Sequence, residues 1–211
     1  MAAKALTPSR EQQEVIDYRG GHLQVIACAG SGKTEAISQR VAALIVEETS
    51  PSAIVAFTFT ERAAASMKSR ILQRVAERLG PDILDSLSPM FVGTIHSFCM
   101  RLLQDHVPEY ADFELLDDHR LVGLLSREHK RLALDRLGDK HWSPIHKFCR
   151  TLDVVENELI RPESLSDTPF GEVYAQFRAM LRRYHFFTFG QLISEAVCAL
   201  KRPEIFRAVH D

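Results

Sequence analysis

The sequence predicts an α/β fold: a three-layer sandwich, with helices on both faces of a parallel sheet, that carries a mostly helical inserted subdomain. Two observations lead to this prediction. In the first half of the chain, short apolar runs alternate with longer segments of helical spacing, the order produced by parallel strands joined by helices. Past residue 110 helical spacing dominates, and only one short apolar run interrupts it. The predicted sheet is incomplete within the 211 residues.

The composition is that of an ordinary globular protein, with 45% hydrophobic and 26% charged residues. The formal net charge is −2, so bulk charge gives no argument for a nucleic-acid partner, which must be argued from local residues. The four cysteines lie far apart and form no C-x-x-C pair, so neither a zinc site nor a disulfide is expected. No apolar run reaches the roughly 18 residues of a membrane span. We therefore expect a soluble, cytoplasmic protein.

The first expected elements lead into a turn of small residues. We expect a helix at residues 10–18, because the preceding T-P-S at residues 7–9 supplies hydroxyl caps and a proline at the helix start. Residues 23–26 (L-Q-V-I) are expected to form a buried strand. The turn follows at residues 27–34 (A-C-A-G-S-G-K-T), and it opens a helix expected from residue 33 to residue 48.

A turn of this kind, between a strand and a helix, is typical of a phosphate-binding loop, or P-loop. Backbone N–H groups of the turn and of the helix start converge on an anion, and Gly30 and Gly32 allow the necessary backbone conformations. Lys33 can reach the outer phosphates, and the Thr34 hydroxyl can ligate Mg²⁺. The consensus loop begins with glycine, where this chain has Ala27. The alternative is a glycine-rich turn without a ligand.

We therefore predict that the chain binds a nucleoside triphosphate with Mg²⁺. Lys33 and Thr34 are the candidate catalytic residues, and Thr34 is the candidate magnesium ligand. The predicted nucleotide contacts from the loop are Ala27, Cys28, Ala29, Gly30, Ser31, Gly32, Lys33 and Thr34.

The elements that follow repeat the order of strand and helix. We expect strands at residues 53–59 and 90–92 and helices at residues 61–79 and 94–107. Thr60 is the expected N-cap of the helix at residues 61–79, whose arginines, Arg74 among them, are expected to face outward. With right-handed crossovers, these elements are expected to form the three-layer α/β sandwich of a P-loop domain.

Residues 110–187 are expected to form the mostly helical inserted subdomain, between a first domain at residues 1–109 and a return to that domain at residues 188–211, which begins with a helix from Thr188. Basic residues concentrate in the insertion: Arg120, Arg127, Lys130, Arg131, Arg136, Lys140, Lys147 and Arg150. Their face could meet a phosphate backbone, and a solvated helix face explains the same pattern equally well.

Three further stretches accompany the P-loop: P-S-R-E-Q-Q-E-V-I at residues 8–16, F-T-F-T-E-R-A-A-A-S-M at residues 57–67, and G-T-I-H-S-F-C at residues 93–99. In this order and spacing, the four stretches resemble the N-terminal part of UvrD/Rep-type superfamily 1 DNA helicases. Residues 113–117 and 187–193 also resemble the entry to, and exit from, that family's helical 1B insertion. The resemblance implies that residues 1–109 are the ATP-binding 1A core.

The resemblance also implies roles for single residues. Gln12 lies where the family reads the adenine edge, a task that suits an amide because it donates and accepts at once. The alternative for Gln12 is a solvated helix glutamine. Glu35 stands where many relatives place an arginine near the base, so no adenine contact is carried over to that position.

Two stretches match the family's motifs for single-stranded DNA: Thr58, Phe59 and Thr60 the first, and Thr94, His96 and Ser97 the second. An aromatic ring can stack a base for about 1–3 kcal/mol, whatever the base, and hydroxyls or an imidazole can bond to phosphate oxygens. From the residues alone, Phe59 reads as a core residue and His96 as a buried structural histidine. Both alternatives stay open.

The function that the resemblance implies is ATP-dependent translocation on single-stranded DNA, with unwinding at single-strand/duplex junctions, in repair or recombination. The family's acidic motif, second RecA-like domain and arginine fingers do not occur in these 211 residues. We therefore expect the front portion of a longer enzyme, whose remaining domains are its partners, and negligible turnover by this portion alone. The alternatives are the helicase half of a RecB/AddA-like helicase–nuclease, a non-catalytic module that binds nucleotide or single-stranded DNA, and, more distantly, a small-molecule kinase.

Overall fold

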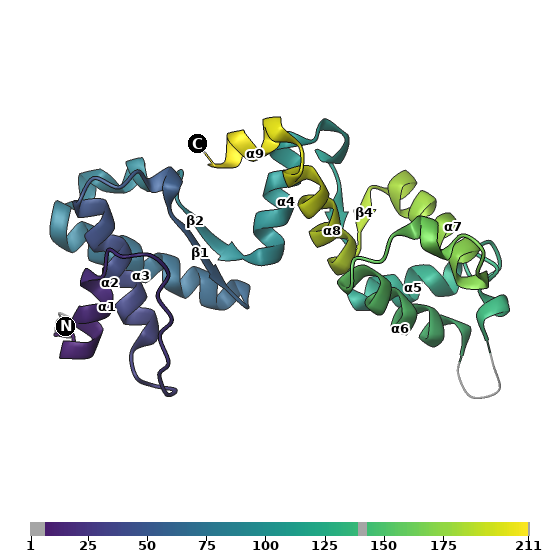
Figure 1. The fold of residues 1–211 in the computed structure, drawn as a ribbon, viewed down its shortest axis with the longest axis horizontal. Coiled ribbons are helices and arrows are strands. Elements are labelled where there is room, and N and C mark those ends of the chain that lie inside the picture. The colour runs from purple at the N-terminus through teal and green to yellow at the C-terminus, as the bar shows by residue number, and fades with distance from the viewer. Residues whose placement is uncertain (1–6, 139–142, 211) are drawn as a thin grey trace. The chain divides into compact units, whose positions relative to one another are not determined.

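A computed structural model describes residues 7–138 and 143–210. The chain divides into two compact units, Met1–Ile95 and His96–Asp211 (Figure 1). Both units combine helices with one small parallel sheet, so the protein belongs to the mixed α/β class and is mostly helical. None of the described helices is both long and apolar enough to cross a membrane.

The first unit places three helices beside a two-stranded sheet (Figure 1). Its elements are α1 (Arg10–Asp17), α2 (Lys33–Val46), β1 (Val55–Thr58), α3 (Glu61–Leu79) and β2 (Phe91–Thr94), with short 3₁₀ turns at Pro51–Ala53 and Pro81–Leu87. β1 and β2 pair in parallel, with Val55 opposite Phe91 and Thr58 opposite Thr94. The helices predicted at residues 10–18, 33–48 and 61–79 and the strands predicted at residues 53–59 and 90–92 are therefore present.

Local chemistry explains where these helices begin and end. The Ser9 and Gln12 side chains exchange hydrogen bonds with each other's backbone N–H groups and form a capping box at the start of α1. The Thr60 hydroxyl accepts from the N–H of Ala63 and caps α3, as predicted. The helix ends at Gly80, at φ 86°, a conformation that favours glycine. The core of this unit lies between α2, α3 and the sheet: Val41, Ala42, Ile45, Ile54, Met67, Ile71, Val75, Leu87 and Met90.

The prediction of a buried strand at residues 23–26 is wrong. Residues 22–28 adopt no regular structure, and Leu23, Val25 and Ile26 are exposed, Ile26 to 91%. The physical reason is that an extended segment becomes a strand only when a neighbour takes its N–H and C=O groups, and among the described residues β1 and β2 pair only with each other. A two-stranded parallel sheet therefore stands where a three-layer sandwich was expected.

The second unit contains two cores. Its elements are α4 (Ile95–His106), β3 (Glu114–Leu115), α5 (Asp118–Arg127), α6 (Pro144–Asn157), α7 (Pro169–Tyr184), β4 (Phe186–Phe187), α8 (Phe189–Leu200) and α9 (Pro203–His210), with 3₁₀ turns at Pro108–Tyr110, Leu134–Leu137 and Pro162–Leu165. Apolar faces of α5, α6 and α7 form one cluster, which we call the helical core and which includes Leu125, Phe148, Leu152, Phe177 and Leu181. α4, α8 and α9 form another around Leu103, Phe113, Phe187, Leu192 and Ile205.

The helices of the second unit begin at side chains that suit the position. Asp117, Ser143, Thr168 and Thr188 are the N-caps of α5, α6, α7 and α8, and each accepts a hydrogen bond from a backbone N–H in the first turn. The helix predicted at residues 94–107 is present as α4, and the short apolar run at residues 113–116 contains β3. β3 and β4 pair in parallel, with Glu114 opposite Phe186.

Candidate functional site

The turn at residues 27–34 has the backbone of an anion-binding loop. Gly30 and Gly32 have φ angles of 79° and 82°, and Gly32 is the N-cap of α2. The N–H of Ser31 donates to the Cys28 carbonyl oxygen at 3.3 Å, which closes the turn. Residues 27–31 are exposed. Since the first N–H groups of a helix have no partner within it, the start of α2 presents donors where a phosphate can bind.

Lys33 lies over this turn. Its ammonium group donates to the carbonyl oxygens of Ala27, at 2.9 Å, and Cys28, at 2.5 Å. Thr34 is half-buried in the first turn of α2, beside Lys33 in sequence. A hydroxyl oxygen suits magnesium, which prefers oxygen ligands and binds largely through substrate phosphates. The residues present therefore fit a magnesium nucleotide.

Gln12 reaches the same loop from α1. Its Nε2 donates to the Ser31 carbonyl oxygen at 2.8 Å, while its Oε1 accepts from the Ser9 N–H at 2.9 Å. An open cavity of about 680 Å³ adjoins these groups, and Gln12, Leu23, Ser31, Lys33, Ile37 and Arg40 are among the residues that line it. Gln12 is thus neither a freely solvated glutamine nor only a helix cap, because it joins α1 to the P-loop.

Arg40 holds α1 against α2, a role that no pattern in the sequence indicates. The Arg40 guanidinium donates to the carbonyl oxygens of Val15, at 2.7 Å, and Tyr18, at 2.5 Å. A cation at the end of a helix is favourable, because the last carbonyl groups there have no intrahelical partner. Arg40 therefore fixes the C-terminal end of α1 to α2 and, with it, the position of Gln12.

Glu35 turns away from the cavity toward α3. Its Oε1 accepts from Arg74 Nε at 2.7 Å, in an ion pair whose side chains are 16% and 15% exposed. Burial favours the neutral form of the Glu35 carboxyl, but hydrogen bonds from Gln39 and Arg74 outweigh that effect and hold the pKa of Glu35 below its usual range. The expectation that Arg74 faces outward is wrong, because the partly buried carboxylate on α2 draws the guanidinium inward.

The first candidate DNA segment lies where both strands of the sheet end. Thr58 and Thr94, opposite each other in the register, are the last residues of β1 and β2. Phe59 follows Thr58 and is 99% exposed, so its interpretation as a core residue is wrong. Glu61, which the sequence did not single out, accepts a hydrogen bond from the Thr94 hydroxyl at 2.9 Å. The structure thus joins Thr58, Phe59, Thr60 and Thr94 in one small region.

His96 and Ser97 belong to the second unit. His96 is half-buried near the start of α4, and its ring meets the Phe189 ring edge to face at 4.9 Å between centroids. This contact with α8 gives His96 a structural role within its unit and leaves part of the side chain accessible.

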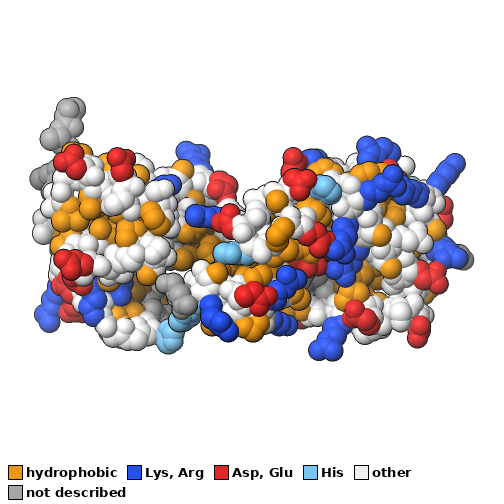
Figure 2. All heavy atoms as spheres, turned by 90° about the horizontal axis from the view of Figure 1, so that it is seen from above, with side chains coloured by type: hydrophobic (Ala, Val, Ile, Leu, Met, Phe, Trp, Pro, Cys, Tyr) orange, Lys and Arg blue, Asp and Glu red, His pale blue; other side chains and the backbone are white. Residues whose placement is uncertain are grey.

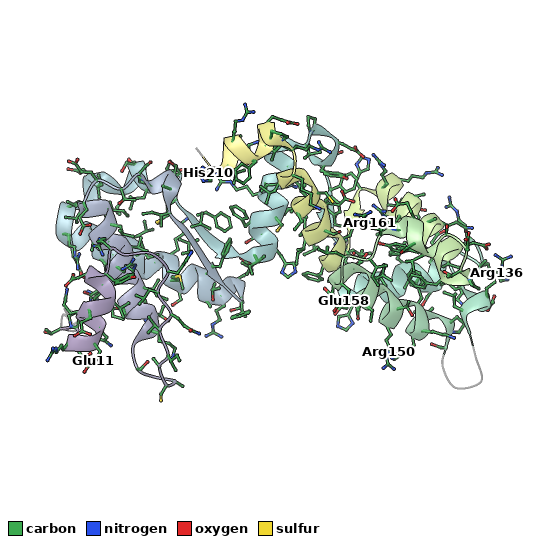
Figure 3. The ribbon with its side chains drawn as sticks, viewed as in Figure 1. Glu11, Arg136, Arg150, Glu158, Arg161 and His210 are labelled. Atoms are coloured by element: carbon green, nitrogen blue, oxygen red, sulfur yellow. The ribbon has the colours of Figure 1, made fainter. Side chains whose placement is uncertain are left out.

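The basic residues of the predicted insertion lie among acidic ones. Four of them are within ion-pair distance of a glutamate: Arg120 with Glu114, Arg127 and Arg131 with Glu128, and Arg136 with Glu172. Figure 2 shows both charge types over this unit, and Arg136 and Arg150 point outward from different elements in Figure 3. Lys140 lies outside the described residues. These pairings fit a solvated, charge-balanced face, the second of the two interpretations above.

A family model described as "UvrD/REP helicase N-terminal domain" matches residues 8–211. The chain belongs to this family. The matched range includes Gln12, the turn at residues 27–34 and both candidate DNA segments of this chain.

Relatives within the UvrD/REP helicase family include the ATP-dependent DNA helicase UvrD1 of Mycobacterium leprae, 30% identical over 92% of this chain. The ATP-dependent DNA helicase PcrA of Bacillus subtilis is 32% identical over 92% of it, and DNA helicase II of Escherichia coli is 32% identical over 93%. The chain spans only 26% to 27% of the length of these curated relatives.

Proposed function

We propose that this chain is the ATP-binding N-terminal part of an ATP-dependent DNA helicase. The observation that carries the proposal is the contact of the Gln12 amide with the P-loop, 2.8 Å from the Ser31 carbonyl oxygen, beside Lys33 in a chain of the UvrD/REP helicase family. An adenine-reading amide and a phosphate-binding ammonium then lie at one cavity, which is what an ATP site needs. The names of the relatives, DNA helicases that depend on ATP, support the same function.

Nucleotide binding would exchange existing contacts for new ones. Lys33 would leave the carbonyl oxygens of Ala27 and Cys28 for phosphate oxygens, while the N–H groups at the start of α2 hold the anion. The Gln12 amide would contact the adenine edge. Mg²⁺, held by the Thr34 hydroxyl and the phosphates, would neutralise charge on the phosphates.

DNA would bind where β1 and β2 end. At this end of the sheet Phe59 can stack a base, Thr58 and Thr60 are the proposed phosphate contacts, and Thr94 is a further residue of the proposed DNA-binding segment. In the second unit, His96 and Ser97 are the proposed phosphate contacts. In the parent enzyme, ATP hydrolysis would drive movement along single-stranded DNA and unwinding at single-strand/duplex junctions, in repair or recombination in the cytoplasm. The catalytic acid and arginine fingers would come from the remaining domains of that parent chain.

The proposed domain arrangement follows the family: a 1A core at residues 1–109, a 1B-like insertion at 110–187 and a return to the core at 188–211. The helical core, all of whose members fall between residues 116 and 181, supports the insertion. We also propose that the 1A core of the parent enzyme is a RecA-like sandwich. Neither the family match nor the relatives' names favours a helicase–nuclease or a non-catalytic module.

Titration with a fluorescent ATP analogue and Mg²⁺ tests the nucleotide site. Lys33→Ala should weaken binding by at least about tenfold, because a hydrogen bond to a charged group contributes about 1.5–3 kcal/mol. Lys68→Ala, at an exposed lysine of α3, is the control and should bind normally. Equal affinity of Lys33→Ala and the unchanged chain would overturn the proposal. Steady ATP hydrolysis by the isolated chain would contradict only its dependence on further domains.

A further inference from the structure

Glu61 lies between the two strand ends that carry the candidate DNA contacts. It is the first residue of α3, directly after Phe59 and Thr60. Its Oε1 accepts from the hydroxyl of Thr94, the last residue of β2, at 2.9 Å. A carboxylate in the first turn of a helix is also favoured by the helix dipole. The side chain therefore has a defined place, although the sequence motif gave it no role.

This contact changes what Thr94 can do. A threonine hydroxyl has one hydrogen to donate, and a phosphate oxygen only accepts. While Thr94 donates to Glu61, its hydroxyl has no hydrogen for a phosphate. The Thr60 hydroxyl differs, because its oxygen accepts from the Ala63 N–H at 3.1 Å and its own hydrogen is not used in that bond. Of these two threonines, Thr60 is the better hydrogen-bond donor to a phosphate, whereas Thr94 affects DNA binding through its hydrogen bond to Glu61.

The same contact fixes the loop that carries Phe59. On one side of the ring, Thr58 is held in the ladder opposite Thr94. After the ring in sequence, Thr60 caps α3, and Glu61 accepts a hydrogen bond from Thr94. Phe59 itself is 99% exposed, so no packing of its own side chain holds the ring in place. Its orientation depends on the two ends of the loop, and Glu61 ties the second end to the sheet.

We propose that Glu61 is a positioning residue for single-stranded DNA. By accepting a hydrogen bond from the Thr94 hydroxyl, Glu61 holds the loop that carries Phe59 in a conformation in which the ring can stack a base. The proposal rests on the DNA-binding role given above. Its energetic basis is preorganisation, because an ordered loop loses less conformational freedom when the DNA binds. The negative charge of Glu61 itself repels phosphates, so the benefit must come from the hydrogen bond.

Glu61→Ala and Glu61→Gln separate the hydrogen bond from the charge. Glutamine keeps an oxygen that can accept from Thr94, whereas alanine removes it. Binding of a labelled oligothymidine to the full chain, followed by fluorescence anisotropy, should weaken about three- to tenfold in Glu61→Ala, the range of one lost hydrogen bond. Glu61→Gln should bind as tightly as the unchanged chain or more tightly. Thr94→Val should reproduce the loss in Glu61→Ala and add nothing when combined with it.

Phe59→Ala provides the second test. In Phe59→Ala the loop no longer carries a ring that stacks a base, so its order contributes little to DNA binding. Glu61→Ala should therefore reduce the affinity for oligothymidine clearly less in the Phe59→Ala background than in the unchanged chain. Additive losses would overturn the proposal, as would tighter binding by both Glu61 variants, because repulsion alone would then explain the effect. The control is Glu77→Ala, which removes a carboxylate near the other end of α3 and should leave Phe59-dependent binding unchanged.

Amide hydrogen exchange at residues 59 and 60 measures how ordered the loop is in the absence of DNA. Exchange should be faster in Glu61→Ala and unchanged in Glu61→Gln, with binding of the ATP analogue retained in both as a check on folding. If the unchanged chain binds no oligothymidine, the DNA-binding role fails, whatever the exchange shows. If it binds but Glu61→Ala changes neither affinity nor exchange, the positioning role alone is refuted.

Discussion

Gly32 is limited both by its backbone conformation and by the space around it. Its φ of 82° lies in the left-handed region, and a Cβ built there would lie 2.6 Å from Nε2 of Gln12. Gly32→Ala should therefore strain the turn and displace the Gln12 amide. We expect ATP-analogue affinity to fall at least about tenfold, corresponding to roughly 1.4 kcal/mol. Gly30→Ala introduces the same backbone strain without a contact to Gln12, so it should lose less affinity for the ATP analogue than Gly32→Ala does.

Gly21→Ala is the matched control, because no atom of the described residues lies within 4 Å of a Cβ at that position and its φ is not in the left-handed region. It should bind the analogue normally. If Gly32→Ala binds as well as Gly21→Ala, the Gln12 contact with the loop has no importance for the nucleotide site.

Single residues were predictable where their role follows from local spacing. The left-handed backbone of Gly30 and Gly32 and the Thr60 cap each depend on neighbours within a few positions, so the sequence was enough. Arg74 was not predictable, because its partner Glu35 lies on another helix, 39 residues away. The exposure of Phe59 was equally hidden, since an aromatic residue at the end of an apolar strand is as suited to a core as to a ligand.

At the scale of elements, helices were easier to predict than strands. Each helix satisfies most of its backbone groups within its own segment and begins at a recognisable cap, as α3 does at Thr60. A strand depends on a partner that its own sequence does not specify. Residues 23–26 have the composition of a buried strand and remain exposed, whereas the similar run at residues 55–58 forms β1 because β2 pairs with it.

The junction of α6 and α8 contains a buried acid whose titration should be measurable. Glu156 is 7% exposed, and burial raises the pKa of its carboxyl from 4.5 to about 7, an effect that the hydrogen bond from the Thr188 hydroxyl at 2.6 Å only partly offsets. Asp153 of α6 raises the pKa further, and Arg178 of α7 lowers it. One carboxyl oxygen, Oε1, has no hydrogen-bond partner among the described residues, so the neutral acid is the better-suited form.

The folded state therefore binds this proton more tightly than the unfolded state. Between pH 4.5 and about pH 7, this group's contribution to the free energy of unfolding should fall as the pH rises, by up to about 3 kcal/mol, and stay constant above that window. Glu156→Gln keeps an acceptor for Thr188 and removes the titration. Its stability relative to the unchanged chain, measured by urea unfolding, should thus increase through the same window.

Glu158→Gln is the matched control for this experiment. Glu158 is exposed at the end of the same helix (Figure 3), so its neutralisation should not reproduce the pH-dependent gain. A stability difference between Glu156→Gln and the unchanged chain that does not vary from pH 5 to pH 8 would contradict the assignment of a raised pKa to Glu156.

At the scale of the whole molecule, each core cluster of the described residues draws its members from a single unit. The cluster around Ile71 draws all its residues from the first unit, and the helical core around Phe148 draws all of its residues from the second. The sequence indicated a change of character near residue 110 but not where the compact units divide, at residue 95. Short-range patterns identify elements, whereas the division depends on which distant side chains pack together, and spacing along the chain does not specify that.

Separate cores predict separate responses to cavity-forming substitutions. Ile71 and Phe148 are both fully buried, so Ile71→Ala should cost about 2–5 kcal/mol and Phe148→Ala about 3–5 kcal/mol in their own unit. Peptide-resolved hydrogen exchange should show faster exchange within residues 7–95 for Ile71→Ala, and within residues 96–210 for Phe148→Ala. Because the P-loop belongs to the first unit, ATP-analogue binding should weaken in Ile71→Ala and persist in Phe148→Ala. Faster exchange in both units from either substitution would mean that the two cores unfold as one, and that the nucleotide site depends on the whole chain.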